Sequence, residues 1–227
     1  MSLRPALGLL EVIERYAEEL FSIGSEPPPQ PRWNQDWFPR LDAAAAYAMV
    51  RSTRPQRIVE VGAGHSTRFL ARAVADGGLA TRITAIDPRP RAAIRGLNVE
   101  WLQARVETLD RGAFARLDEN DSLFIDSSHQ LKPGSDVEFL MNEVIPRLRA
   151  GARVHFHDIF LPDGYPAGWA WRRYNEQAEV KKLIDAGALR IDFSSHAAGN
   201  GEPLGGVLAR LPLVPGAVES SLWLTKT

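Results

Sequence analysis

The spacing of hydrophobic residues predicts helices in the first quarter of the chain. Apolar residues recur at helical intervals over residues 9–21, with charges between them, which indicates an amphipathic helix. Residues 41–52 are alanine-rich and end before Pro55, so a second helix is predicted there. The proline-rich segment 24–31 is expected to be an extended connector. The apolar stripe of the first helix packs on the domain, forms a dimer contact or covers a site, and the pattern leaves these alternatives open.

From residue 57 onward, short apolar runs alternate with helical patterns. The predicted strands are 58–61, 83–87, 99–103, 123–126, 153–156, 189–193 and 220–225, and the predicted helices are 67–75, 88–95, 106–117, 137–148 and 172–186. Residues 206–211 compete with 220–225 for the last strand, while residues 160–171 and 197–206 are expected to be irregular. Strands that alternate with helices at this spacing form a parallel sheet with helices on both faces. The pattern therefore predicts an α/β fold.

Composition and charge narrow the class of protein. A chain of 227 residues can bury one substantial core, and a second complete core is not expected. The formal net charge of −1 gives no reason to expect a protein that coats nucleic acid or a membrane surface. Because the sequence has no cysteine, disulfides, thiol nucleophiles and cysteine metal sites are excluded. Charged residues interrupt the apolar residues of positions 1–21, so we predict neither a signal sequence nor a membrane span there and expect a soluble cytoplasmic protein.

A buried strand, a tight turn and a helix N-terminus are predicted in succession by residues 57–67, RIVEVGAGHST. Gly62 and Gly64 permit a turn in which the backbone comes close to a ligand. Ser66 or Thr67 can cap the following helix, whose free N–H groups favour a negatively charged group. This stretch therefore indicates a nucleotide-like ligand.

The residues around this turn indicate which nucleotide. Asp87 ends the second predicted strand, twenty-three positions after Gly64, and at this spacing an acidic residue meets ribose hydroxyls. Thr67 stands where a dinucleotide fingerprint has its third glycine. Glu60 precedes the turn, where a carboxylate suits a ligand with an ammonium group better than a pyrophosphate. The combination favours an adenosine-type ligand that carries an ammonium group.

These residues resemble the motifs of the class I S-adenosylmethionine-dependent methyltransferases, in which an acidic-x-Gly-x-Gly turn is followed by an acidic residue at the end of the second strand. The resemblance covers about residues 54–158. It implies a Rossmann-like methyltransferase fold with a seven-stranded, mostly parallel sheet, helices on both faces and an antiparallel last strand. We accordingly divide the chain into an N-terminal helical extension with a strap, residues 1–53, and a methyltransferase catalytic domain, residues 54–227.

The resemblance also implies how S-adenosyl-L-methionine is bound. The glycine turn and the acidic residue before it line the methionine part, Asp87 binds the ribose diol, and Gln103 lies near the adenine. The implied set of cofactor-binding residues is Glu60, Gly62, Ala63, Gly64, Ser66, Thr67, Asp87, Gln103 and Asp126.

Two aspartates end neighbouring strands of the predicted sheet. Asp126 closes the fourth strand and Asp158 follows the fifth, so their carboxylates repel unless a cation or a proton lies between them. Oxygen ligands of this kind suit Mg²⁺. His129 follows Asp126 by three residues, and the ordinary pKa of an imidazole suits it to take a proton from a hydroxyl.

This arrangement looks like that of the macrocin-type and related sugar O-methyltransferases. In that group an aspartate after the fourth strand and an acidic pair after the fifth strand hold a divalent metal, and the histidine is the base. Here His157-Asp158 replaces the acidic pair, and a histidine ligand shifts the preference toward Mn²⁺. The resemblance implies Asp126, His157 and Asp158 as ligands of Mg²⁺ or Mn²⁺, and His129, Asp126 and Asp158 as the catalytic residues.

Structural roles compete with several of these assignments. An aspartate at position 126 or 158 can instead cap a loop or a helix, and Asp87 can cap a helix that starts at Pro88. His129 can be an ordinary polar loop residue. The expected rim of the acceptor pocket consists of Trp169, Trp171, Tyr174, Asn175 and Glu176.

We predict a methyltransferase that modifies a hydroxyl of a small, polyhydroxylated, sugar-like acceptor. An NAD-dependent oxidoreductase and a non-catalytic binding protein on the same fold remain alternatives. No membrane partner is expected, and the absence of a net basic charge argues against a nucleic-acid substrate. Whether the chain forms a homo-oligomer stays open.

A titration of the purified protein separates these alternatives. We expect S-adenosylhomocysteine to bind and NAD not to bind, because the turn lacks the third glycine. The titration is repeated with Mg²⁺ and with Mn²⁺. Tight binding of NAD would contradict the methyltransferase prediction, and cofactor binding without any metal effect would contradict the metal clamp alone.

Overall fold

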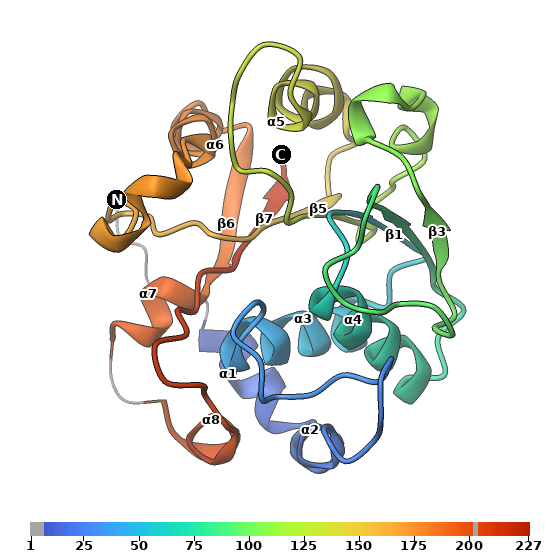
Figure 1. The fold of residues 1–227 in the computed structure, drawn as a ribbon, viewed down its shortest axis with the longest axis vertical. Helices are drawn as coiled ribbons and strands as arrows, with labels where there is room; N and C mark the ends of the chain where they lie inside the picture. The colour runs from blue at the N-terminus through green and yellow to red at the C-terminus, as the bar shows by residue number, and fades with distance from the viewer. Residues whose placement is uncertain (1–6, 202–203) are drawn as a thin grey trace.

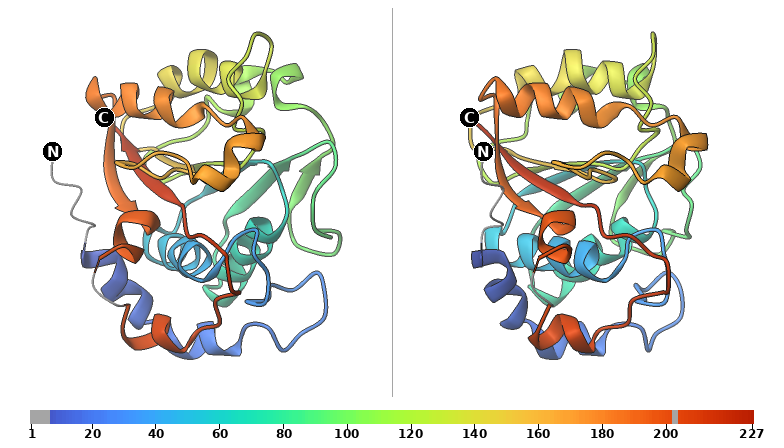
Figure 2. Two further views of the ribbon diagram at one scale, coloured as in Figure 1. Left: turned by 60° about the vertical axis from the view of Figure 1, so that its left-hand side comes forward. Right: turned by 90° about the vertical axis from the view of Figure 1, so that its left-hand side faces the viewer.

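The computed structural model describes residues 7–201 and 204–227. Residues 1–6 of the predicted N-terminal extension and residues 202–203 of the predicted irregular segment lie outside the described residues. The described chain forms three layers, with a sheet between two layers of helices (Figure 1 and Figure 2). None of its helices is both long and apolar enough to cross a membrane.

Seven strands form one sheet in the order β3-β2-β1-β4-β5-β7-β6. They are β1 (Arg57–Val61), β2 (Arg82–Ile86), β3 (Glu100–Leu102), β4 (Ser122–Ile125), β5 (Arg153–Phe156), β6 (Leu189–Ser194) and β7 (Leu222–Lys226). β7 is antiparallel to both of its neighbours, and the remaining pairs are parallel. The predicted sheet with an antiparallel last strand is thereby confirmed. The competing strand at 206–211 is wrong, because these residues lie in and next to a short helix.

Eight α-helices surround the sheet in the described part of the chain. They are α1 (Leu7–Glu14), α2 (Ala17–Ser22), α3 (Arg40–Thr53), α4 (His65–Asp76), α5 (Asp136–Phe139), α6 (Glu176–Asp185), α7 (Ser195–Gly199) and α8 (Gly206–Arg210). The first predicted helix is divided in two between Glu14 and Ala17. α5 continues through a π-helical turn, Leu140–Val144, and a 3₁₀ turn, Ile145–Arg147, so the helix predicted at 137–148 is present but irregular.

Two predicted helices do not form. Residues 88–95 are bends and turns, because the Asp87 carboxylate accepts the N–H of Arg89 and the carbonyl of Ala63 accepts the N–H of Arg91. Residues 106–117 contain only two 3₁₀ turns, Val106–Thr108 and Arg111–Ala113. At the start of the second turn, the Asp110 side chain accepts a hydrogen bond from the N–H of Gly112. Such local hydrogen bonds compete with those of a helix.

The sheet separates two apolar cores, and alternate strand residues enter each of them. Ile58 and Phe124 face α3 and α4, whereas Val59 and Ile125 face α5 and α6. Figure 2 shows α3 and α4 against one face of the sheet and α5 and α6 against the other. Because α3 shares a core with β1, the predicted extension and the predicted catalytic domain are packed together, and their division at residue 54 stays a prediction.

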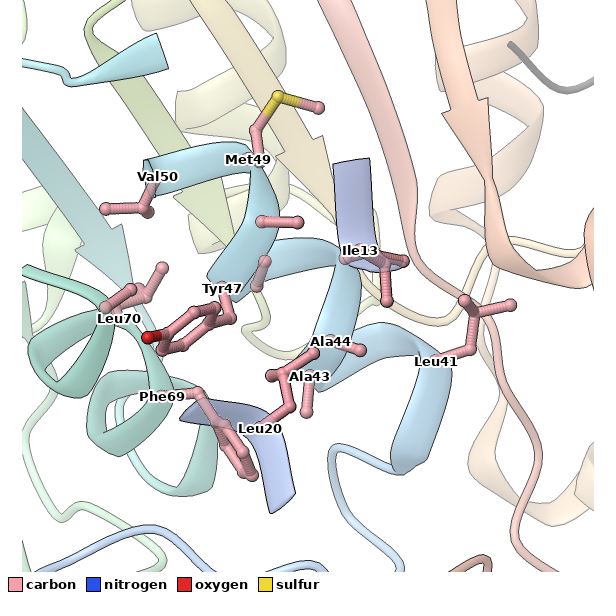
Figure 3. Packing of buried hydrophobic residues seen from close by; sticks show 14 of the residues in the cluster. Ile13, Leu20, Leu41, Ala43, Ala44, Tyr47, Met49, Val50, Phe69 and Leu70 are labelled. Carbon is pink, nitrogen blue, oxygen red and sulfur yellow. The ribbon is translucent and has the colours of Figure 1, made fainter. Parts of the chain in front are cut away.

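α3 is buried along almost its whole length. Residues 43–46 are four consecutive alanines, each fully buried, and Tyr47 follows them (Figure 3). Side chains of this size allow α3 to lie close to α4 and to the strands beneath it. Phe69 and Leu70 of α4 pack in the same cluster, with Leu20 of α2 (Figure 3).

We expect Ala44→Leu to destabilise the fold by about 1 to 3 kcal/mol, because extra methylenes in a filled core force neighbouring groups out of place. Denaturant unfolding followed by circular dichroism measures the change. Ser52→Leu places the same side chain at an exposed position of α3 and should leave stability within about 0.5 kcal/mol of the parent. Equal stability of the two variants would contradict the close packing of α3.

Candidate active site

A cavity of about 460 Å³ opens at the carboxyl ends of β1, β2, β4 and β5. Open α/β sheets bind ligands at this edge. The cavity is lined by the turn after β1, by Asp87, by residues 104–107, and by side chains that follow β4 and β5. The predicted site residues that line it are Gly62, Ala63, Gly64, Ser66, Asp87, Asp126, His129, His157 and Asp158.

The turn after β1 is pressed against the end of β4. Gly62 has a φ of +85°, and a Cβ at this position would lie 1.8 Å from the carbonyl oxygen of Asp126. Residue 62 must therefore be glycine on two independent grounds, backbone conformation and space. The close approach brings the turn to the side of Asp126.

The two hydroxyl residues after the turn have different partners. Ser66 Oγ donates to Glu60 Oε1 at 2.6 Å, and the backbone N–H of Gly64 donates to Thr67 Oγ1 at 2.9 Å. Thr67 is fully buried and closes the turn from behind, whereas Ser66 reaches the cavity. Thr67 thus stabilises a turn that has two glycines instead of three.

Glu60 is a buried carboxyl group with one oxygen, Oε2, that has no hydrogen-bond partner. Burial raises its pKa from 4.5 to about 8, although the hydroxyls of Ser66 and Thr67 oppose this, and the negative charges of Asp126 and Asp87 raise it further. The group therefore holds a proton near neutral pH. A bound ammonium group nearby would favour its ionised form, but Glu60 itself does not line the cavity, which its partner Ser66 reaches.

Asp87 holds the turn from the side of β2. Its Oδ2 accepts the N–H of Ala63 at 2.7 Å, and its Oδ1 accepts the N–H of Arg89 at 2.6 Å. No helix begins at Pro88, so Asp87 is not a helix cap. Gln103 donates to the carbonyl of Pro88 at 3.1 Å and does not line the cavity, whereas the four residues after it, 104–107, do.

Four side chains meet at the ends of β4 and β5, and two imidazoles lie between carboxylates. His129 Nε2 lies 3.3 Å from Asp126 Oδ1 and 3.6 Å from Asp158 Oδ2. His157 Nδ1 lies 3.5 Å from Asp126 Oδ1 and 3.4 Å from Asp158 Oδ1. The predicted residues are thus brought together as a single cluster of opposite charges.

Two further acids complete this cluster. Glu176 is fully buried, and its Oε2 lies 2.9 Å from His129 Nδ1, so this residue is not on the pocket rim where it was predicted. Asp42 of α3 is fully buried and contacts His157 Nε2 at 3.1 Å. Asp42 also accepts the backbone N–H groups of Ser220 and Ser221. Asp42 was not among the predicted site residues. Its only signal in the sequence is that it is a single acidic residue in an alanine-rich helix.

The carboxylates keep both imidazoles protonated. Burial lowers the pKa of His129, but its contacts with Asp126 and Glu176 outweigh burial and raise the pKa well above 6.5. Burial likewise lowers the pKa of His157, and the charges of Asp126 and Asp158 reverse this. The pKa of Asp126 is lowered because the two imidazoles outweigh its desolvation.

These residues do not fit the predicted metal ion. A metal ligand needs an unprotonated nitrogen, whereas both nitrogens of His157 point at carboxylates. Within residues 7–201 and 204–227, no group of three or more acidic or histidine side chains is arranged to hold a metal. The imidazoles occupy the position between Asp126 and Asp158 that the sequence assigned to a cation.

Aromatic side chains cover the part of the cavity that contains His129. The ring of Tyr174 lies 4.6 Å from that of His129, and Trp169 packs edge-on against Tyr174. Both line the cavity. Trp171 is 74% exposed and, like Asn175, does not line it. The predicted rim is therefore formed by two of its five members.

The part of the chain that forms this site resembles a known protein family. Residues 59–159 match the family model of a methyltransferase domain. No curated protein matches the chain. The match, which includes the turn after β1 and both aspartates, supports a methyltransferase enzyme.

Solved structures share the fold. The methyltransferase PaMTH1 from Podospora anserina, bound to S-adenosylhomocysteine, is 16% identical with a TM-score of 0.52, covering 96% of this chain and 88% of its own. An O-methyltransferase from Bacillus cereus, in complex with S-adenosylhomocysteine, is 14% identical with a TM-score of 0.52, covering 99% of this chain and 93% of its own. At this identity the likeness establishes the fold.

Glu60 sets a dependence of stability on pH. The folded protein keeps a proton on Glu60 that the unfolded chain releases above its ordinary pKa of 4.5, so stability falls as pH rises from 4.5 to about 8. Glu60→Gln removes this loss and should stabilise the free protein by about 1 to 3 kcal/mol at pH 7, with little change at pH 4.5. Urea unfolding at several pH values measures the difference.

The control is Glu11→Gln, the same chemical change at an exposed position of α1. It should follow the pH dependence of the parent. If Glu60→Gln also follows the parent across this range, Glu60 does not hold a proton in the folded protein.

Proposed function

We propose that the chain transfers the methyl group of S-adenosyl-L-methionine to a hydroxyl of a small, polyhydroxylated, sugar-like acceptor. One observation carries the proposal. A single cavity joins the glycine turn after β1 to a cluster of imidazoles and carboxylates after β4 and β5. A cofactor bound at that turn would lie beside side chains that can accept or donate a proton.

The residues that would hold the cofactor are those of the turn and its supports. Glu60 and residues 62–64 take the methionine part, Asp87 the ribose diol, and Gln103 with the residues after it the adenine end. Ser66, Thr67 and Asp126 support the same site. When bound, S-adenosylmethionine supplies an activated methyl group, so the protein has only to align the acceptor oxygen and remove its proton.

His129 is the proposed base. Glu176 holds its Nδ1, which leaves Nε2 facing Asp126 and Asp158. Because the neighbouring carboxylates favour the protonated imidazole in the free protein, His129 must release its Nε2 proton before it can act as a base. The unprotonated Nε2 would then accept the proton of the acceptor hydroxyl, and the bound cofactor would supply the methyl group, its carbon–sulfur bond breaking as the bond to the acceptor oxygen forms.

Asp126 and Asp158 are the proposed clamp for adjacent hydroxyls of the acceptor. Each carboxylate has an oxygen within 3.6 Å of an imidazole nitrogen and lines the cavity. Ser220 Oγ donates to Asp158 Oδ1 at 3.1 Å and orients that group. Two neighbouring carboxylates, each able to accept a hydrogen bond, favour a substrate with more than one hydroxyl. No step of this proposal passes through a metal.

We expect His129→Ala to lose methyl transfer by about 10²- to 10⁴-fold while keeping its affinity for S-adenosylhomocysteine within about threefold, because it removes the base and not the cofactor turn. Glu176→Gln keeps the contact with Nδ1 but removes its charge, and should cost about tenfold in kcat. Transfer of labelled methyl from S-adenosylmethionine to a panel of sugars and sugar acids measures activity, and calorimetry measures binding.

His196→Ala is the matched control, because this histidine lies outside the cavity and bonds to Asp163. It should retain the activity of the parent. Full turnover by His129→Ala would remove His129 as the base. A parent protein that binds S-adenosylhomocysteine but methylates no acceptor would support a non-catalytic binding protein instead.

A further inference from the structure

A cation without an acidic partner stands at the acceptor end of the cavity. Arg172 ends the 3₁₀ turn Ala167–Arg172 in the loop between β5 and α6, and it lines the cavity. Within the described part of the chain, no carboxylate lies within ion-pair distance of its guanidinium group. Arg105, which also lines the cavity, is in contrast paired with Glu107 at 2.6 Å.

The guanidinium group of Arg172 is held by aromatic side chains. Its central carbon lies 4.1 Å from the ring centre of Trp169, 5.2 Å from that of Trp171 and 5.5 Å from that of Tyr174. One terminal nitrogen donates to the Tyr174 hydroxyl at 3.0 Å. These contacts give the fork a defined position and use few of its five N–H donors.

One of the remaining donors is buried without a partner. Arg172 Nε is inaccessible to solvent and makes no hydrogen bond in the structure. A buried donor left unpaired costs free energy, but a ligand cannot meet an atom that solvent cannot reach unless its neighbours shift, so the terminal N–H groups of the fork are the donors available to a ligand. Guanidinium groups pair best with carboxylates and phosphates, because two parallel N–H groups match two oxygens.

Tyr174 links this cation to the proposed base. Its hydroxyl accepts the bond from Arg172, and its ring packs on the imidazole of His129. Only the side chain of Tyr174 would therefore separate a group bound by Arg172 from His129. Arg172 lies on the β5–α6 loop with Trp169 and Tyr174, on the side of the cavity where Tyr174 covers His129.

We propose that the acceptor carries an acidic group, a carboxylate or a phosphate, and that Arg172 binds it and determines specificity for it. This inference rests on the proposed function and narrows it, from polyhydroxylated molecules in general to hydroxylated acids. The acidic group anchors the acceptor at Arg172 while a hydroxyl meets His129. The nearby carboxylates of Asp126 and Asp158 repel an anion that is placed beside them.

The test compares matched pairs of acceptors on the protein loaded with S-adenosylhomocysteine. D-Glucuronate has a carboxylate where D-glucuronamide has a neutral carboxamide. D-Glucose 6-phosphate carries a phosphate that D-glucose lacks. We expect the acid of at least one pair to bind about tenfold or more tightly than its neutral partner, and the pair that responds distinguishes the two sources. Ligand-observed NMR titration measures the affinities.

Three variants assign the preference to one side chain. Arg172→Gln should abolish the difference within the pair and leave the affinity for S-adenosylhomocysteine within about threefold of the parent. Arg172→Lys keeps the charge and should retain part of the preference. Arg173→Gln, the same change at the exposed neighbouring residue that does not line the cavity, should retain all of it.

Several results would overturn the inference. These are equal or tighter binding of the neutral member in both pairs, no binding of either acid, or an acid preference that survives Arg172→Gln. A tenfold loss of S-adenosylhomocysteine affinity in Arg172→Gln would assign Arg172 to the cofactor carboxylate instead. Methyl transfer is followed in parallel, because an acid that binds through Arg172 but is not methylated contradicts the proposed function and leaves the anion site standing.

Discussion

The contact between the turn after β1 and the end of β4 is the constraint on which the site depends. Only a glycine at position 62 allows the turn to lie against the carbonyl of Asp126, and the Asp126 N–H in turn donates to Val61 at 2.9 Å. This contact places the cofactor turn and the first carboxylate of the cluster side by side. Every other element of the site is arranged around it, since β5 pairs with β4 and brings His157 and Asp158 to the same edge.

Opposite charges in the cavity stabilise one another. Asp126 and Asp158 come close enough to repel, and the imidazoles of His129 and His157 lie between them. Glu176 and Asp42 then neutralise the outer nitrogens of the two imidazoles. A buried polar atom without a partner is costly, and the described residues leave several such atoms near the cavity, among them Glu60 Oε2 and Arg172 Nε.

The segment before β1 takes part in this arrangement. α3 packs its alanines into the core under β1, which is why Asp42 at its start can reach His157 and the backbone before β7. Glu219 meanwhile pairs with Arg40, so the start of α3 and the approach to β7 are joined twice. Residues that looked like an extension in the sequence therefore help to position the cluster of imidazoles and carboxylates.

Local pattern determined the sheet, the glycine turn, and the aspartates and histidines at the strand ends, because strand periodicity, glycine and strand-end position are properties of neighbouring residues. Tertiary structure alone decided that Glu176 and Asp42 hold the imidazoles, since these pairs are 47 and 115 residues apart along the chain. Tertiary structure also contributed to the loss of the predicted helix 88–95, because the carbonyl of Ala63 takes the N–H of Arg91. At 106–117, in contrast, a local bond from the N–H of Gly112 to Asp110 competes with the helix. The misfit between the predicted metal and the described side chains also has a tertiary origin: the sequence shows which ligands could meet, but only their packing shows that imidazoles fill the space between the carboxylates.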